Sequence, residues 1–301
     1  TTTRDTLSLH DALPISPRDE QWGIVCTTAG HQHVPPGTPY PVSEHPEHYL
    51  FYKGSGRTLD EYQLVYITAG RGRFESASCP SQTVEAGTML LLFPNEWHSY
   101  SPDPGTGWTE WWVGFRGANI DRLEQQGFLC RRRPLLRIGC SGGIERCYRE
   151  IIGTVEEERV GFQPLISSIV LHILGSVLFK HSNLLYSDNP VVEKINRAKA
   201  IMRTDFGRNR SPEQIAREVG MGYTWFRRVF REYVGMAPAQ YQHTMRLNKA
   251  RELLATTAHS ISEIAYALGF ESVSAFSLFF RLRERLSPSQ YRARFRGGKG
   301  Q

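Results

Sequence analysis

The sequence predicts an α+β protein: an N-terminal β-barrel followed by helices, then an all-α C-terminal domain. Three observations predict this. Short β-rich segments separated by turns fill much of the first half. Residues 211–241 and 260–291 repeat one helical pattern. The charge is uneven, with 20 Lys and Arg against 9 Asp and Glu from Pro190 to the end of a 301-residue chain of net charge +6. The basic end is therefore expected to bind a polyanion.

The first sixteen residues are expected to lie outside the fold. Residues 1–16 resemble translated sequencing-adapter read-through, and they lack the charged-then-apolar layout of a signal peptide. A native arm without fixed structure is the alternative. The barrel is therefore assigned to residues 17–125.

Within the barrel, turn residues separate the expected strands. Residues 62–68 are rich in β-formers and are expected to end at a glycine turn at 70–72. A second turn at 85–87 precedes the apolar run 89–93, and 108–115 forms one more strand. Short strands at regular spacing favour a barrel or a sandwich.

Residues 126–182 are expected to form a helical segment, in which Pro164 opens the second of two helices between 144 and 180. The apolar run 165–179 contains serines and a histidine and falls short of the roughly 18–20 residues that span a bilayer. It predicts a buried helix and no membrane segment. Five scattered cysteines without CxxC spacing fit a reducing compartment, so the expected location is cytoplasmic.

After a linker at 183–190, residues 191–296 contain the two copies of the repeat. Each copy has Ile-Ala, then a glycine, then Phe-x-x-x-Phe, then Pro-x-x-Tyr, offset by 49 residues at the front and 50 at the back. A short helix, a glycine-containing turn and a second helix with aromatic anchors is typical of a helix-turn-helix. Two such motifs in a basic region indicate a DNA-binding domain.

With these anchors at these spacings, residues 190–296 resemble the DNA-binding domain of AraC-type transcription regulators. The upstream region resembles the sugar-sensing, cupin-like domain of the same family, with matches at 62–72, 93–100 and 108–116. Together the resemblances cover nearly the whole chain after residue 16. They imply a cupin-like barrel, then dimerisation helices, then a tandem helix-turn-helix domain.

The second helix of each motif is expected to enter the major groove. In the first copy, Phe226 and Phe230 share a core face with Val229. The opposite face presents the candidate DNA-binding residues Thr224, Trp225, Arg227, Arg228 and Arg231. The resemblance places Thr224 and Arg228 at base-reading positions, where an arginine suits guanine. Alternatively, any one of these arginines contacts only the phosphate backbone.

In the second copy, the candidate DNA-binding residues are Ser274, Ser277 and Arg281. Leu278 stands where the family often has arginine, and Arg285 stands where a turn glycine is common. Leu278 cannot donate a hydrogen bond, although it could pack on a thymine methyl. Weaker base discrimination is therefore expected here. The resemblance implies that one helix, 238–256, links the two modules rigidly, with Arg246 pairing inside the domain or touching phosphate.

In the last barrel strand, alternation places Trp108, Glu110 and Trp112 on one face. A buried, unpaired carboxylate is costly, so Glu110 needs an arginine, water or ligand hydroxyls. An indole can stack on the apolar face of a pyranose ring. By resemblance to the arabinose regulator, Tyr100, Glu110 and Trp112 fall on pocket positions and Arg57 lies near the family's ligand-binding arginine. Tryptophans that serve only as core are the alternative, which we favour for Trp111.

The resemblance implies a transcription regulator, with an activator favoured, and no enzyme. Its implied partners are double-stranded promoter DNA, a small-molecule effector such as a monosaccharide, a second copy of the chain, and RNA polymerase if it activates. The helices between 144 and 180 would form the dimer by analogy, although a purely intramolecular role is the alternative. The sequence leaves open the effector, the operator, and activation against repression.

No cofactor or metal is expected, and two other classes fit poorly. A metal-dependent cupin enzyme needs converging His and carboxylate ligands, but His31-x-His33 precedes the expected strands and only His98 lies within them. An alkyl-transfer DNA repair protein needs an activated cysteine, and residues 190–301 contain none.

Overall fold

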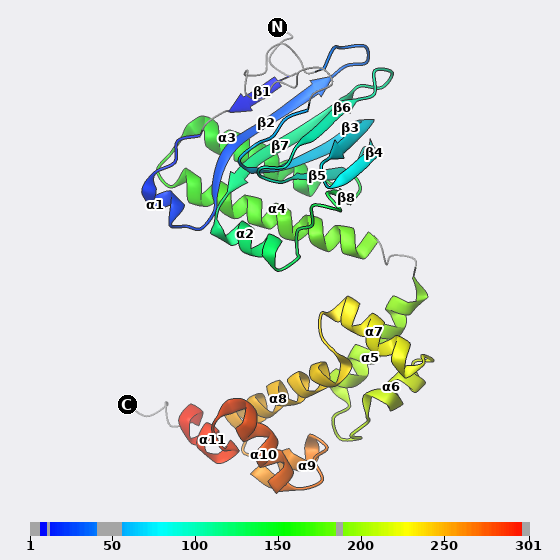
Figure 1. The fold of residues 1–301 in the computed structure, drawn as a ribbon. Helices are drawn as coiled ribbons and strands as arrows, with labels where there is room; N and C mark the ends of the chain where they lie inside the picture. The colour runs from blue at the N-terminus through cyan, green and yellow to red at the C-terminus, as the bar shows by residue number, and fades with distance from the viewer. Residues whose placement is uncertain (1–6, 11–12, 41–55, 185–188, 297–301) are drawn as a thin grey trace. The chain divides into compact units, whose positions relative to one another are not determined.

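The computed structural model describes residues 7–10, 13–40, 56–184 and 189–296 (Figure 1). The chain forms two compact units that divide between residues 185 and 186. The described part of the first unit holds an antiparallel sheet with the order β1-β2-β7-β3-β5-β8, onto which β4 and β6 pair through β3. The strands are β1 (Leu7–His10), β2 (Val25–Val34), β3 (Tyr62–Ser76), β4 (Cys79–Glu85), β5 (Thr88–Leu92), β6 (His98–Pro102), β7 (Trp108–Arg116) and β8 (Leu135–Arg137).

The long strand β3 organises this sheet. Its first half pairs with β5 and β7, and its second half pairs with β4 and β6. The turn predicted at 70–72 is wrong, because the strand continues through both glycines. A Cβ on Gly70 would lie 2.1 Å from the carbonyl oxygen of Gly107, and one on Gly72 would lie 2.2 Å from that of Ser101. The glycines therefore permit close backbone approach and a bend instead of ending the strand.

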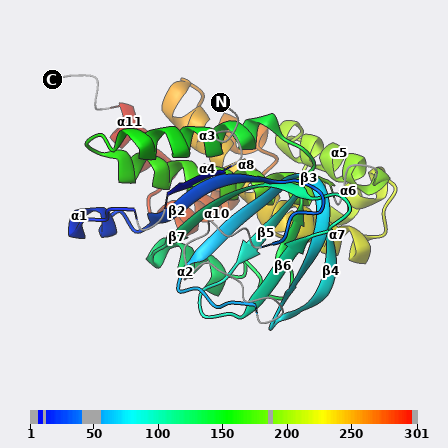
Figure 2. The ribbon, with the colours of Figure 1, turned by 90° about the horizontal axis from the view of Figure 1, so that it is seen from above.

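The two faces of the sheet carry two separate cores. Trp111, Val113 and Phe115 pack on the face covered by α3 (Gly142–Glu157) and α4 (Phe162–Leu184), and Figure 2 shows these helices lying across the sheet. Trp108 and Trp112 belong to a second cluster on the other face. The alternation predicted for this strand is confirmed, and it separates a helix-covered core from the face that holds the candidate pocket residues.

The helix α4 is longer than the apolar run in the sequence. It spans 23 residues and is long and apolar enough to cross a membrane by length and composition, and 44% of its most apolar stretch is buried. It packs against α3, β2 and β8 through residues such as Ile166, Val170 and Ile173. In this unit the helix is a covering layer of the sheet.

Two segments differ from the expected boundaries. Residues 7–10, expected outside the fold, form β1 on the edge of β2, and Leu13 is buried in the core. An edge strand offers free backbone donors and acceptors, which explains why this segment pairs there. The strand β8 lies inside the expected helical segment, and α4 continues to Leu184 inside the expected linker. The first unit also contains α1 (Pro17–Glu20) and α2 (Ala118–Gln125).

The described part of the second unit is helical. Its helices are α5 (Pro190–Thr204), α6 (Pro212–Glu218), α7 (Tyr223–Val234), α8 (Pro238–Thr256), α9 (Ile261–Ala267), α10 (Val273–Glu284) and α11 (Pro288–Arg296). Ser211 and Ser260 begin α6 and α9 with the same capping box, so the repeat in sequence is a repeat in structure. Each module has its own core, built around Phe226 and Phe230 or around Phe276 and Phe280.

The loop between α5 and α6 joins the two modules. Phe206 in this loop packs against the core of the second module. The guanidinium of Arg246, on α8, donates to Asn209 Oδ1 at 2.7 Å and lies over the ring of Phe270. Of the two roles left open for Arg246, the structure therefore shows pairing inside the domain. These contacts, which we call the inter-module clasp, add to α8 in fixing one module against the other.

Candidate functional site

The face of the sheet opposite the helices brings together the four candidate ligand residues. Trp112 and Glu110 come from β7 and Tyr100 from β6, and all three are buried. Arg57 is half-buried and forms an isolated bridge with His98 at the start of β6. The structure thus places Arg57, Tyr100, Glu110 and Trp112 in one neighbourhood, although they are far apart in the sequence.

Arg57 is held by the two residues beside it. Its terminal nitrogen donates to the Tyr100 hydroxyl at 2.9 Å, and its Nε donates to His98 Nε2 at 3.3 Å. Burial and the nearby Arg57 charge lower the pKa of His98 to about 4, so this imidazole is neutral and can accept the hydrogen bond. His98 is not among the site residues that the sequence predicts, and in the structure its ring holds Arg57 in place.

Glu110 has an incompletely satisfied carboxylate. The Tyr40 hydroxyl donates to Glu110 Oε1 at 3.3 Å. Within the described residues, Glu110 Oε2 and the neighbouring Trp108 Nε1 have no hydrogen-bond partner, although both are buried. Burial raises the pKa of Glu110 to about 7, against the lowering influence of Tyr40, of the Arg57 charge and of the neighbouring Trp108 indole N–H. One donor and one acceptor are therefore available side by side on this face.

A second buried carboxylate provides the contrast. Glu61 accepts hydrogen bonds from Thr27 and, at 2.7 Å, from Gln63 Nε2. It fills space left open by Gly114, where a Cβ would lie 2.4 Å from Glu61 Oε1. Burial raises the pKa of Glu61, but both of its oxygens have donors. Of these two carboxylates, Glu110 is the one with unused hydrogen-bonding capacity.

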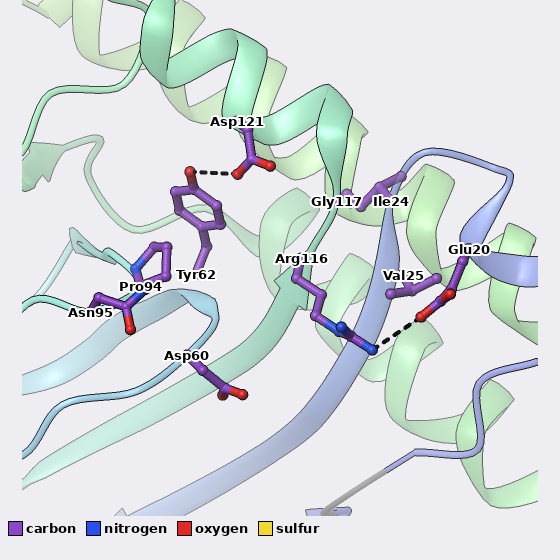
Figure 3. A pocket seen from close by; sticks show the side chains of 10 residues that line it. All are labelled: Glu20, Ile24, Val25, Asp60, Tyr62, Pro94, Asn95, Arg116, Gly117 and Asp121. Carbon is purple, nitrogen blue, oxygen red and sulfur yellow. Dashed lines mark hydrogen bonds and ion pairs between the residues drawn. The ribbon is translucent and has the colours of Figure 1, made fainter. Parts of the chain in front are cut away.

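The first unit also has a surface cavity of about 390 Å³ at the end of β7 far from Trp108 (Figure 3). Its polar groups largely satisfy one another. The Tyr62 hydroxyl donates to Asp121 Oδ1 at 3.0 Å, and Arg116 pairs with Glu20 at 3.3 Å. This cavity is separate from the residues that the sequence singled out.

In the first module, the candidate DNA-binding residues lie on the outer face of α7. Phe226 and Phe230 are fully buried, whereas Thr224, Arg227 and Arg228 are exposed. Trp225 and Arg231 are exposed as well, and in the described part of the unit the three arginines make no ion pair. This face therefore offers three available cations and an indole.

The second module presents a different face on α10. Ser274 and Arg281 are exposed and Ser277 is half-buried, while Leu278 is 52% exposed at the centre of the same face. Arg283 is exposed as well, but its guanidinium lies 4.0 Å over the Phe279 ring and contacts His243. The second face is thus less cationic than the first.

His31 and His33, which bear on the alternative of a metal-dependent enzyme, do not lie where the sequence suggested. His31 and His33 belong to β2 and do not precede the strands. Their register places them beside Trp111 and Thr109, on the face away from Glu110. Among the described residues, no group of three His, Cys, Asp or Glu side chains could hold a metal ion.

Tyr40, Trp108 and Gln32 were not predicted as site residues. Trp108 could have been found, because it shares the alternation of Glu110 and Trp112. Gln32 is buried opposite Glu110 in the β2–β7 pair, and only the strand register reveals it. Tyr40 precedes the strand β3 by more than twenty residues, so no local pattern connects it to Glu110.

Family comparisons match both units. A family model described as an AraC-like ligand binding domain matches residues 48–174, and one described as a helix-turn-helix domain matches residues 215–294. The raffinose operon regulatory protein RafR of Pediococcus pentosaceus is 24% identical over 80% of this chain and 87% of its own length. The transcriptional activator RhaS of Salmonella newport is 29% identical over 77% of this chain and 85% of its own length.

Two solved structures each resemble about a third of this chain. An AraC-type regulator from Chromobacterium violaceum is 34% identical, covering 36% of this chain and 97% of its own, with a TM-score of 0.33. The DNA-binding domain of AdpA in complex with a target DNA is 32% identical, covering 37% of this chain and 97% of its own, with a TM-score of 0.32.

Proposed function

The chain belongs to the AraC family of DNA-binding transcription regulators, which carry a ligand-binding domain, and from this premise we propose that it is a sugar-responsive activator. Relatives named for raffinose and for an activator, RafR and RhaS, support the effector class and the direction of control. The chain is proposed to act as a homodimer that contacts RNA polymerase at a promoter and to have no enzymatic activity.

The ligand is proposed to bind on the face of the sheet opposite α3 and α4. Its binding residues would be Glu110, Trp112, Tyr100 and Arg57. The observation that carries this proposal is a pair of buried neighbouring groups, Glu110 Oε2 and Trp108 Nε1, for which the described residues supply no hydrogen bond of normal geometry. A hydroxyl donates one hydrogen bond and accepts another, so it satisfies both groups, whereas an ammonium only donates and a carboxylate only accepts. The flat Trp112 indole adds an apolar surface against a sugar ring.

A thermal-shift screen of the full chain against monosaccharides and glycosides tests this site. A neutral polyhydroxylated ligand should raise the melting temperature, since binding to the native state stabilises it. Trp112→Ala should abolish the shift, while Trp22→Ala, which removes an exposed indole, should retain it. If organic acids or amines raised the melting temperature and sugars did not, the proposed sugar effector would be wrong.

On DNA, Thr224 and Arg228 are proposed to read bases through the first module, with Trp225, Arg227 and Arg231 beside them. Ser274, Ser277 and Arg281 are proposed to make the contacts of the second module. Exposure of the α7 residues and the absence of ion pairs among its described arginines support this assignment. The inter-module clasp supports simultaneous contact with successive major grooves, which are roughly 34 Å apart.

A further inference from the structure

The two modules present different chemistry at equivalent positions. The 50-residue offset of the repeat equates Arg228 on α7 with Leu278 on α10. Both positions lie opposite the buried phenylalanines of their own helix and both are exposed. The position that offers a guanidinium in the first module offers an isobutyl group in the second.

Leu278 has an exposed apolar neighbour on the same helix. Leu282 lies one turn further along α10 and is 71% exposed, against 52% for Leu278. The core of this module is made by Phe276 and Phe280, so neither leucine is needed to pack it. Single exposed leucines are common on surfaces, but two adjacent ones on the helix expected to enter the groove form an apolar contact surface.

The surroundings of these leucines fit DNA. Arg281 is exposed on α10, Arg285 is exposed where this helix ends, and Ser274 lies one turn before Leu278 on the same face. The whole region from Pro190 onward carries 20 Lys and Arg against 9 Asp and Glu, which complements phosphate. The clasp and α8 join the modules in one unit, so α7 and α10 are held at a fixed separation on the same domain.

The C5-methyl group of thymine is the apolar feature of the base edges in the major groove. We propose that the second module is a thymine reader, in which Leu278, extended by Leu282, packs on thymine methyl groups of the second half-site. This inference rests on the proposed role of the second unit in DNA reading. In this proposal, apolar contact gives the second module its base specificity, and Ser274 and Arg281 make polar contacts beside the leucines.

Substitution of uracil for thymine tests the contact, because it removes only the methyl group. A binding duplex would first be selected from a random pool with the full-length protein. Replacing each thymine of the second half-site by uracil should weaken binding about four-fold at the contacted position, the effect of removing about one buried methylene-sized group. In Leu278→Ala the same replacement should have no further effect, as expected when both changes remove one contact.

Arg228→Ala supplies the matched control. This variant should bind the selected duplex more weakly and yet retain the full uracil effect in the second half-site. Unchanged affinity for every uracil duplex, or a uracil effect that persists in Leu278→Ala, would overturn the thymine assignment. Failure to select any sequence from the pool would instead contradict the proposed DNA-reading function itself.

Discussion

At the scale of single residues, burial and pairing distinguish groups that the sequence treats alike. Glu61 and Glu110 are both buried glutamates of the same sheet domain, but only Glu110 has a free oxygen among the described residues. His98 is buried too, and it is neutral because burial and Arg57 lower its pKa to about 4. The chemistry of this face therefore depends on neighbours from four different strands and loops.

The raised pKa of Glu110 predicts a pH-dependent stability. Its pKa is about 7 in the folded chain, against an ordinary value of 4.5, so the folded state keeps a proton that the unfolded state releases. The free energy of unfolding contributed by Glu110 therefore falls as pH rises from about 4.5 to 7. The free energy of unfolding of Glu110→Gln lacks this loss. The difference between the variant and the wild type should therefore grow by on the order of 3 kcal/mol as the pH rises through this range.

Denaturant unfolding of both proteins at pH 5 and pH 8 measures this difference. His98 has the opposite sign, since its lowered pKa makes stability fall as pH drops below about 6.5, but it is present in both proteins and cancels. The same stability difference at the two pH values would show that Glu110 titrates normally.

Arg228 is the residue whose change separates base reading from phosphate contact. Arg228→Ala should weaken DNA binding by about 1–3 kcal/mol and relax preference at one base pair. Affinities for a panel of singly substituted duplexes at several salt concentrations would measure both effects. Equal weakening on every duplex, together with a shallower salt dependence, would identify Arg228 as a phosphate contact instead.

At the scale of elements, the turn glycines of the two modules occupy different surroundings. Gly220 and Gly269 both have positive φ, +67° and +74°. A Cβ on Gly269 would lie 2.2 Å from the carbonyl oxygen of Phe206, whereas one on Gly220 would approach only Lys194 Nζ at 3.6 Å. The clasp therefore needs a glycine at 269 for space as well as for conformation.

The pair Gly220→Ala and Gly269→Ala isolates the clasp. Gly220→Ala should cost roughly 1–2 kcal/mol, the strain of a left-handed residue with a side chain. Gly269→Ala should cost a further 1–3 kcal/mol or so from crowding against Phe206. Chemical unfolding, followed by the helical circular dichroism signal, measures both free energies of unfolding. Equal destabilisation by the two substitutions would show that the loop at Phe206 moves aside without an energetic cost.

At the scale of the whole molecule, α4 leaves an apolar surface on the side away from the sheet. Leu165 is 48% and Phe179 69% exposed, and Phe179 lines a groove of about 450 Å³ together with Leu171, His172, Gly175, Ser176 and Lys180. The opposite side of the helix faces the sheet, where Ile169 and Ile173 are buried in the core. This outward surface supports the proposed homodimer.

Charge on that surface should therefore dissociate the dimer. Phe179→Asp should shift the chain to monomer in sedimentation experiments, because a carboxylate would be buried without a partner. Phe128→Asp is the matched control, since Phe128 is 62% exposed and lies outside α4. Dimers that persist in Phe179→Asp and are lost in Phe128→Asp would place the interface elsewhere.

Short-range sequence patterns were sufficient to predict much of the secondary structure of this protein. The repeated anchors predict both helix-turn-helix motifs, because helix period and turn glycines act over a few residues. Alternation along residues 108–115 predicts which tryptophans share a face, and this is confirmed. The exposed faces of α7 and α10 follow from the same local periodicity.

Contacts between distant segments required the tertiary structure. The continuation of β3 through Gly70 and Gly72 depends on backbone approach from β6 and the β6–β7 loop, and the pairing of Tyr40 with Glu110 joins segments 70 residues apart. The clasp likewise links Asn209 to Arg246 and Phe206 to the turn at Gly269. Local propensity cannot predict such contacts, because they arise only when separate elements pack and exclude water between them.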